Sequence, residues 1–132
     1  MTNPAFHVKH LDHVTIVVRD LARTRWFYVE VLGMQEVARP AFSFAGQWFR
    51  AGPTLIHTIL EHEQSGPAGQ GASLTSRGHH VAFMVEDARA WETYLRQHGC
   101  GLLGPAKQRP DGAWQLFVQD PDGHLIELCS GP

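Results

Sequence analysis

An internal duplication restricts the folds open to this chain. The segment HVTIVVRD begins at His13, and the similar segment HVAFMVED begins at His80. In both segments apolar residues alternate with a period of two, as in a half-buried strand. An aspartate, Asp20 or Asp87, follows each histidine by seven residues, where it can cap a helix. Two such units in 132 residues predict one compact domain built from two similar halves.

Composition and charge exclude several classes of function. The formal net charge is −2 and no run of Lys or Arg occurs, so nothing favours nucleic acid or an anionic membrane as a partner. No apolar run is long enough to span a bilayer, and the sequence has no secretory signal, which indicates a cytoplasmic protein. The two cysteines lack metal or disulfide spacing, so we expect reduced thiols.

The first half predicts the element order βαβββ. A helix is expected from the Asp20 cap to Leu32, ended by Gly33, with Trp26 and Phe27 in the core. The strands that follow are separated by Pro40 and by the Ala51-Gly52-Pro53 turn, because Pro and Gly interrupt regular secondary structure. The four strands are expected at residues 10–18, 34–39, 41–50 and 54–61.

The second half predicts the same order. A helix at residues 88–97 is expected to end at Gly99, and residues 120–123 (DPDG) have the composition of a tight hairpin turn. The four strands are expected at residues 78–85, 102–107, 113–119 and 124–129. The sequence therefore predicts an α+β fold.

We expect the single domain, residues 1–132, to contain two tandem βαβββ modules. The modules comprise residues 8–62 and 78–130, and a flexible linker rich in Gly, Ser, Gln and Pro joins them at residues 63–77. The helix covers one side of each sheet. The two modules should then form half-barrels around a shared concave cleft.

Four potential metal ligands are predicted to face this cleft, two from each module. The first strand contributes His13 and its repeat contributes His80, while His57 and Glu127 occupy equivalent positions in the last strand of each module. Three imidazoles and one carboxylate suit one divalent ion such as Zn, Fe, Ni, Co or Mn. Four protein ligands would leave two positions open for substrate oxygens, as catalysis requires.

Other polar and aromatic residues are candidates for the lining of the cleft. Ordinary packing or a solvated charge is the alternative interpretation for each of them. These candidate substrate-binding residues are Thr15, Trp48, Arg50, Lys107, Arg109, Gln115 and Phe117.

Between Leu11 and Leu128 the sequence resembles the vicinal oxygen chelate superfamily, which includes glyoxalase I, extradiol dioxygenases and bleomycin-resistance proteins. The resemblance is carried by DHVTIVVRDL, WFYVEVLGM, HHVAFMVED and QDPDGHLIEL, in this order. It implies metal ligands at His13, His80 and Glu127. His57 stands where glyoxalase I often has glutamate, so Glu127 is the one carboxylate left to act as a catalytic base.

The resemblance implies glyoxalase I chemistry as the first hypothesis. This is lyase or isomerase chemistry on a small molecule, such as a thiol conjugate, that is chelated through vicinal oxygens and passes through a metal-stabilised enediolate. A fosfomycin-type thiol transferase is the alternative, because Thr15 and Lys107 match positions found there. An extradiol-type dioxygenase and a non-enzymatic, bleomycin-resistance-like binding protein also remain open. In this superfamily a site is built within one chain or across two, and we expect a homodimer.

Overall fold

The first module is a four-stranded mixed sheet with one helical segment. The computed structural model describes residues 5–69 and 75–132. The strands lie in the order β1-β4-β3-β2, and β1 runs parallel to β4. The elements are β1 (His13–Val18), α1 (Leu21–Arg25), η1 (Trp26–Val31), β2 (Gln35–Val37), β3 (Gly46–Ala51) and β4 (Thr54–Leu60).

The second module repeats this topology. Its strands lie in the order β5-β8-β7-β6, with β5 parallel to β8. The elements are β5 (Val81–Met84), η2 (Ala88–Ala90), α2 (Trp91–Gln97), β6 (Lys107–Gln108), β7 (Trp114–Gln119) and β8 (Leu125–Ser130). The predicted α+β fold with two βαβββ modules is confirmed, and neither sheet closes into a barrel.

The predicted helix boundaries are confirmed by their caps. The Asp20 side chain accepts a hydrogen bond from the Arg23 backbone N–H, and Asp87 accepts one from Arg89 N–H. Gly33 follows the first helical segment with a positive φ of 78°, a conformation that glycine adopts without strain. No described helix is long and apolar enough to cross a membrane.

Two predicted strands begin five residues later than expected, at Gly46 and at Lys107. Residues 41–45, predicted as part of a strand at 41–50, form a loop before β3. In this loop Phe42 and Phe44 stack on each other, and the Arg39 guanidinium lies over both rings. Local aromatic packing therefore replaces strand pairing.

The strand predicted at residues 102–107 is reduced to one bridge, between Leu102 and Val118, and to the two-residue β6. Gly104 has a φ of 138° and Pro105 follows it, so the backbone here cannot continue a regular ladder. The remaining strands were predicted correctly to within a few residues, although residues 10–12 and 78–80 lie outside them.

The prediction that Trp26 is a core residue is wrong. Residues Trp26–Val31 form a π-helical turn, and the side of it that faces the core carries Phe27, Tyr28 and Val31. Trp26 therefore faces outward and is 40% exposed, whereas Phe27 is buried as expected.

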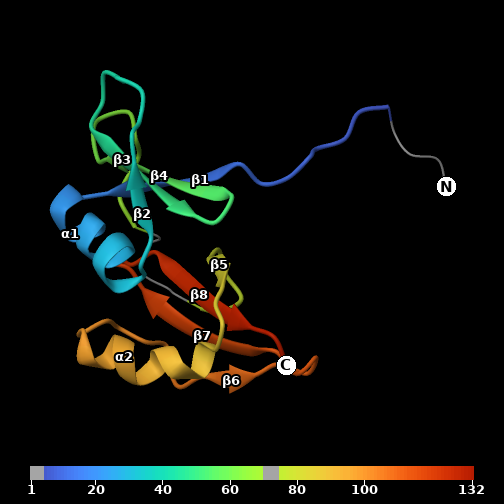
Figure 1. The fold of residues 1–132 in the computed structure, drawn as a ribbon. Helices are drawn as coiled ribbons and strands as arrows, with labels where there is room; N and C mark the ends of the chain where they lie inside the picture. The colour runs from blue at the N-terminus through green and yellow to red at the C-terminus, as the bar shows by residue number, and fades with distance from the viewer. Residues whose placement is uncertain (1–4, 70–74) are drawn as a thin grey trace.

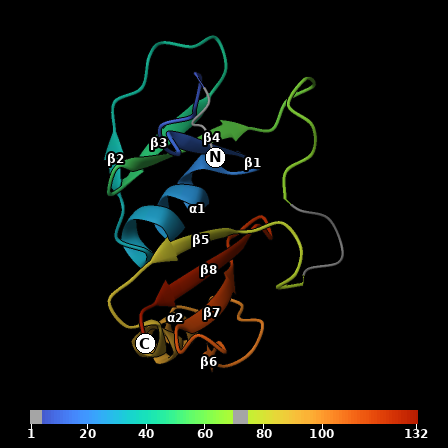
Figure 2. The ribbon, with the colours of Figure 1, turned by 90° about the vertical axis from the view of Figure 1, so that its right-hand side faces the viewer.

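One hydrophobic core joins the two modules. Buried residues of the first module, including Phe27, Tyr28 and Phe49, belong to the same cluster as Leu116 and Ile126 of the second. Figures 1 and 2 show that α1 lies between the two sheets. The helical segment of the first module thus packs against both sheets.

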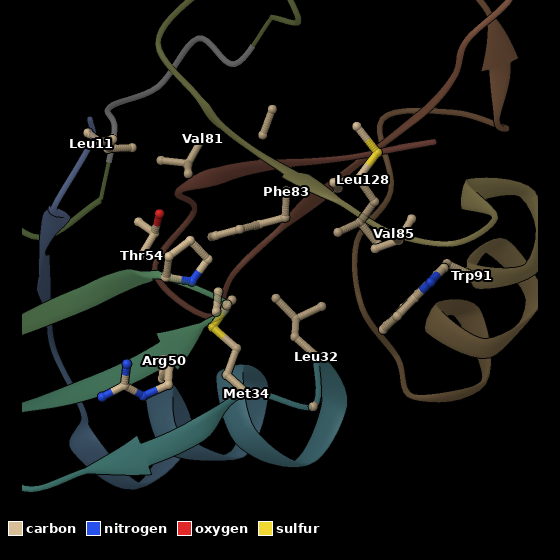
Figure 3. A pocket seen from close by; sticks show the side chains of 16 residues that line it. Leu11, Leu32, Met34, Arg50, Thr54, Val81, Phe83, Val85, Trp91 and Leu128 are labelled. Carbon is tan, nitrogen blue, oxygen red and sulfur yellow. The ribbon is translucent and has the colours of Figure 1, made fainter. Parts of the chain in front are cut away.

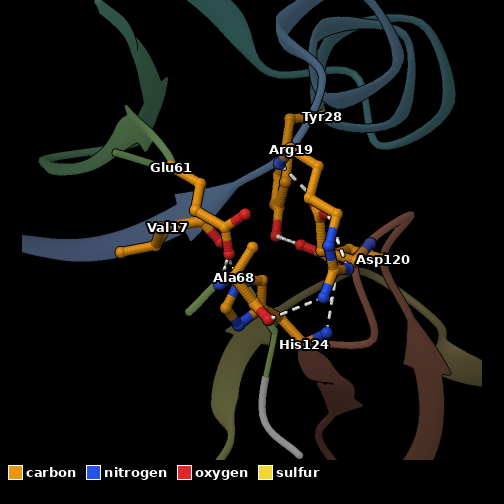
Figure 4. Close-up of polar contacts among 8 residues, drawn as sticks. Val17, Arg19, Tyr28, Glu61, Ala68, Asp120 and His124 are labelled. Carbon is orange, nitrogen blue, oxygen red and sulfur yellow. Dashed lines mark hydrogen bonds and ion pairs between the residues drawn. The ribbon is translucent and has the colours of Figure 1, made fainter. Parts of the chain in front are cut away.

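A buried polar network also connects the modules (Figure 4). The Tyr28 hydroxyl donates to Asp120 Oδ2 at 2.7 Å, while Asp120 Oδ1 accepts from the backbone N–H groups of Asp122 and His124. His124 Nε2 donates to the Val17 carbonyl at 2.8 Å. Burial raises the pKa of the Asp120 carboxyl. The predicted DPDG turn is therefore also a connection between the modules.

The predicted linker is attached to the body of the protein before residue 70. Ala68 is buried, its N–H donates to Glu61 Oε2, and its carbonyl accepts from Arg19. Residues 70–74 of the predicted linker lie outside the described residues.

Candidate metal centre

The sheet register places His57 and Glu127 at equivalent positions. His57 in β4 pairs with Thr15 in β1, two residues after His13. Glu127 in β8 pairs with Ala82 in β5, two residues after His80. Each potential ligand of the fourth strand therefore shares a sheet face with the histidine of the first strand.

The first pair of potential ligands consists of His13 and His57. Their rings stack with centroids 3.9 Å apart and planes inclined by 13°. The Trp48 ring stacks on the other face of His57 at 4.0 Å. His57 is thus held between an indole and an imidazole.

A carboxylate fixes the orientation of His13. His13 Nδ1 lies 2.8 Å from Asp12 Oδ2, and this hydrogen bond is the main cause that lowers the pKa of Asp12. Because the carboxylate is an acceptor, His13 donates through Nδ1, and in the neutral ring the lone pair is then on Nε2. Carboxylates commonly orient metal-binding histidines in this way.

His57 has a buried nitrogen without a partner. Its Nε2 forms no hydrogen bond with any described residue, although such buried atoms are normally satisfied. Burial, followed by the charge of the neighbouring His13, lowers the pKa of His57. The ring therefore stays neutral at neutral pH, in the state that binds a metal.

The second pair consists of His80 and Glu127. His80 Nε2 lies 3.1 Å from Glu127 Oε1, and the Glu127 side chain is buried. The Phe117 ring packs edge-on against His80, with centroids 5.4 Å apart. The second oxygen, Glu127 Oε2, lies 3.9 Å from Arg109 Nη1.

The His80–Glu127 contact requires a positive charge between the two groups. His80 Nδ1 donates to the Gly78 carbonyl at 2.9 Å, so a neutral His80 ring has its lone pair on Nε2. That lone pair and the carboxylate both face the same 3.1 Å gap, and one proton or a metal ion must occupy it. The donor set of imidazole and carboxylate fits a divalent metal ion.

The four potential ligands form two pairs rather than one cluster. Within residues 5–69 and 75–132, no three His, Cys, Asp or Glu side chains gather closely enough to hold one ion. The pairs lie on different sheets, His13 and His57 on the first and His80 and Glu127 on the second. In the stacked pair the lone pairs lie in nearly parallel planes, so His13 or His57 must turn for both to bind one ion.

Three of the candidate substrate-binding residues lie together beside the second pair. Lys107, Gln115 and Phe117 line one pocket of about 340 Å³. Thr75 and Ser76 also line it, and sequence reasoning missed them because they lie in the predicted linker. The pocket combines one cation, one amide and two hydroxyls, which suits an anionic group of a ligand.

The other candidates are spread over different surfaces. Thr15 shares a hollow of about 470 Å³ with His80, between β1 and the start of β5. Arg50 lines a separate apolar groove, and Trp48 packs on His57. Asp12, which orients His13, was also missed, and its position directly before a candidate ligand was the available signal.

Comparison with known proteins identifies the family. Residues 10–128 match the model of the Glyoxalase/Bleomycin resistance protein/Dioxygenase superfamily. The chain belongs to this superfamily. It is 30% identical over 122 residues to the lactoylglutathione lyase of Escherichia coli, covering 89% of this chain and 90% of that protein. It is 28% identical over 130 residues to the fosfomycin resistance protein FosX of Listeria innocua, covering 94% of this chain and 91% of that protein.

Other relatives agree with the superfamily. The chain is 28% identical over 130 residues to Glyoxylase I 4 of Arabidopsis thaliana, covering 97% of this chain and 74% of that protein. A solved structure from Bacillus anthracis, of a protein assigned to the glyoxalase family, superimposes with a TM-score of 0.76 at 27% identity. That superposition covers 100% of both chains, so both modules share its arrangement.

Proposed function

We propose that this member of the superfamily is a divalent-metal-dependent enzyme of the glyoxalase I type, with each site completed by two copies of the chain. The observation that carries the proposal is the His80–Glu127 pair, in which His80 Nε2 and the buried Glu127 Oε1 lie 3.1 Å apart while His80 Nδ1 is bound to the Gly78 carbonyl. The partnerless Nε2 of His57 supports a ligand role in the first module.

Four side chains would hold the metal, His80 and Glu127 from one copy and His13 and His57 from the other. The two pairs lie on separate sheets, and no three potential ligands cluster among the described residues of one chain, which supports pairing between copies as the way to complete the site. When bound, the ion would supply Lewis-acid polarisation of vicinal substrate oxygens.

The proton transfer is assigned to Glu127. It is the one carboxylate among the four side chains, and it would take a proton from the carbon next to a substrate carbonyl. The Arg109 guanidinium, 3.9 Å from Oε2 and paired with Asp111, would keep the carboxylate charge partly balanced in its buried position. His80 is oriented by the Gly78 carbonyl, which accepts from Nδ1, so Nε2 would be the metal-binding nitrogen.

A small anionic molecule suits the remaining surface. The pocket of Lys107, Gln115, Thr75 and Ser76 adjoins Phe117, which packs on His80. An anionic group of the substrate would therefore bind beside the reacting atoms. A thiol conjugate with a carboxylate fits this description, in agreement with the similarity to lactoylglutathione lyase.

A fosfomycin-type thiol transferase is the second candidate, and Lys107 favours it. The cation lies in a polar pocket next to the second ligand pair, where it could bind a phosphonate. The similarity to FosX, at 28% identity, supports the same alternative.

Metal content and a substrate screen test the proposal. Chelated protein offered Zn, Fe, Ni, Co and Mn should take up about one ion per chain. This uptake should weaken as the pH falls through about 6.5, because protons compete for the imidazoles. The metal-loaded protein is then offered hemithioacetals, 2-oxoacyl thioesters, fosfomycin with thiols, and catechols in air. Absence of stoichiometric uptake of every ion would instead indicate a metal-free binding protein.

A further inference from the structure

An apolar N-terminal arm, residues 5–11, leaves the body of the protein (Figure 1). Phe6 is 91% exposed and Val8 is 93% exposed, so neither side chain packs against its own chain. The exposed polar residues His7 and Lys9 alternate with them. This period of two is that of a strand with one apolar face.

An apolar groove lies between the modules of the same chain (Figure 3). It has a volume of about 450 Å³ and is bordered by β5, the end of η1, the β3–β4 turn and α2. Most of its side chains are apolar, among them Leu32, Met34, Val81, Phe83, Val85 and Trp91. Met84, which also lines it, is 75% exposed.

The groove has an open strand edge. β5 is the terminal strand of its sheet and pairs only with β8 among the described strands. Open edges readily accept a further extended segment, whose side chains then alternate between the surfaces beside the edge. The arm has the alternation and the apolar face that such a segment needs.

Charge also favours contact between the arm and the groove. Lys9 lies in the arm, and Glu86 is the second residue after the end of β5. Both residues are exposed, and neither forms an ion pair with any described residue. Leu11 lines the groove of its own chain, but residues 6–8 run outward from it, so the arm leaves its own groove unfilled.

We infer that the arm of one copy binds in the groove of a second copy, with Phe6 and Val8 as the buried side chains. Every copy carries both parts, so the exchange is reciprocal and closes as a twofold dimer. The inference rests on the arm and the groove and holds whatever reaction the protein catalyses. The arm would also hold His13 of one copy near the second copy, as the proposed two-chain site requires. The five residue steps from Val8 to His13 span at most about 17 Å.

Two arm variants test the interface on metal-free, full-length protein. The double variant Phe6→Ser with Val8→Ser should weaken dimerisation at least about a hundredfold in sedimentation equilibrium, since each buried side chain is worth roughly tenfold or more. His7→Ser, on the polar side of the same arm and with no contact assigned to it, is the matched control for a loss of apolar contact and should leave dimerisation nearly unchanged. A monomeric wild-type protein, or a double variant that dimerises normally, would overturn the inference.

Photocrosslinking identifies the surface that the arm occupies. Phe6 is replaced by benzoylphenylalanine, and this protein is mixed with an excess of isotope-labelled wild-type protein before illumination. Crosslinks from the benzoylphenylalanine at position 6 to labelled peptides that contain residues 81–85 or Trp91 are expected. Crosslinks within one chain, or to labelled peptides elsewhere, contradict the inference. Because no metal or substrate is present, failure of the proposed function would leave both results unchanged.

Discussion

At the residue scale, His13 and His80 are oriented by a hydrogen bond at Nδ1. Asp12 accepts from His13 Nδ1 and the Gly78 carbonyl accepts from His80 Nδ1, so in both rings Nε2 is the nitrogen that is left to bind a metal. These acceptors come from neighbouring residues in the sequence. The duplicated strand therefore repeats the orientation of the histidine as well as its position.

Substitutions of Glu127 and His57 should separate catalysis from metal binding. In Glu127→Gln an amide oxygen remains to bind the metal but cannot accept a proton, so turnover should fall by about a hundredfold to ten-thousandfold at saturating metal. His57→Ala should lower metal affinity by about tenfold to a hundredfold while much of the rate returns at saturating metal. Isothermal titration and steady-state kinetics on the best substrate provide the two measurements.

Wild-type turnover by metal-loaded Glu127→Gln would show that Glu127 is a ligand only. In that case the base must be another group near the site. Loss of turnover in His57→Ala that excess metal does not restore would likewise contradict the assignment of His57 as a ligand without a role in proton transfer.

The sequence could predict on which sheet face each of the four candidate ligands lies, but not which of them come together at one site. The period of two places His13 and His57 on one face and His80 and Glu127 on another, as the register has it. Whether the two faces meet within a chain depends on how the modules pack, which no local pattern specifies. The stacking of Trp48 on His57 likewise depends on the pairing of β3 with β4.

At the element scale, the connection between Tyr28 in η1 and the turn after β7 joins the two modules. Tyr28→Phe removes the buried hydroxyl that donates to Asp120 and leaves that oxygen without its partner. We expect a loss of about 1–3 kcal/mol in the free energy of unfolding. Urea denaturation of the metal-free protein measures it.

Tyr94→Phe is the matched control. Its hydroxyl donates to the Val31 carbonyl at 2.7 Å in a half-buried position, where water can replace it. This variant should lose less stability than Tyr28→Phe, about 0.5–1.5 kcal/mol. Equal losses of unfolding free energy in the two variants would mean that the buried Tyr28–Asp120 hydrogen bond stabilises the protein no more than the half-buried Tyr94–Val31 hydrogen bond.

Element order followed from the sequence because caps and turns are local. Asp20, Asp87 and Gly33 act through their nearest neighbours, and all three have the predicted roles. The strand predicted at residues 41–50 was too long because its apolar residues Phe42 and Phe44 pack against Arg39 and each other. Apolar alternation alone does not distinguish such a loop from a strand.

At the scale of the whole molecule, the account depends on how two chains combine. One chain supplies two pairs of ligands on separate sheets, and the proposed site needs one pair from each copy. A dimer would therefore hold two equivalent sites, each with His80 and Glu127 from one chain and His13 and His57 from the other. A site within one chain would require no such exchange.

The most direct test is complementation between two variants that each lack one pair. One variant carries His13→Ala and His57→Ala, and the other carries His80→Ala and Glu127→Ala. They bear different affinity tags and are co-expressed, so that the mixed dimer can be purified and its metal content measured.

Each variant alone should bind almost no metal at the site. The mixed dimer should bind about one ion, because it contains one site with all four ligands and one site with none intact. A mixed dimer with no more metal than the separate variants would contradict the two-chain site.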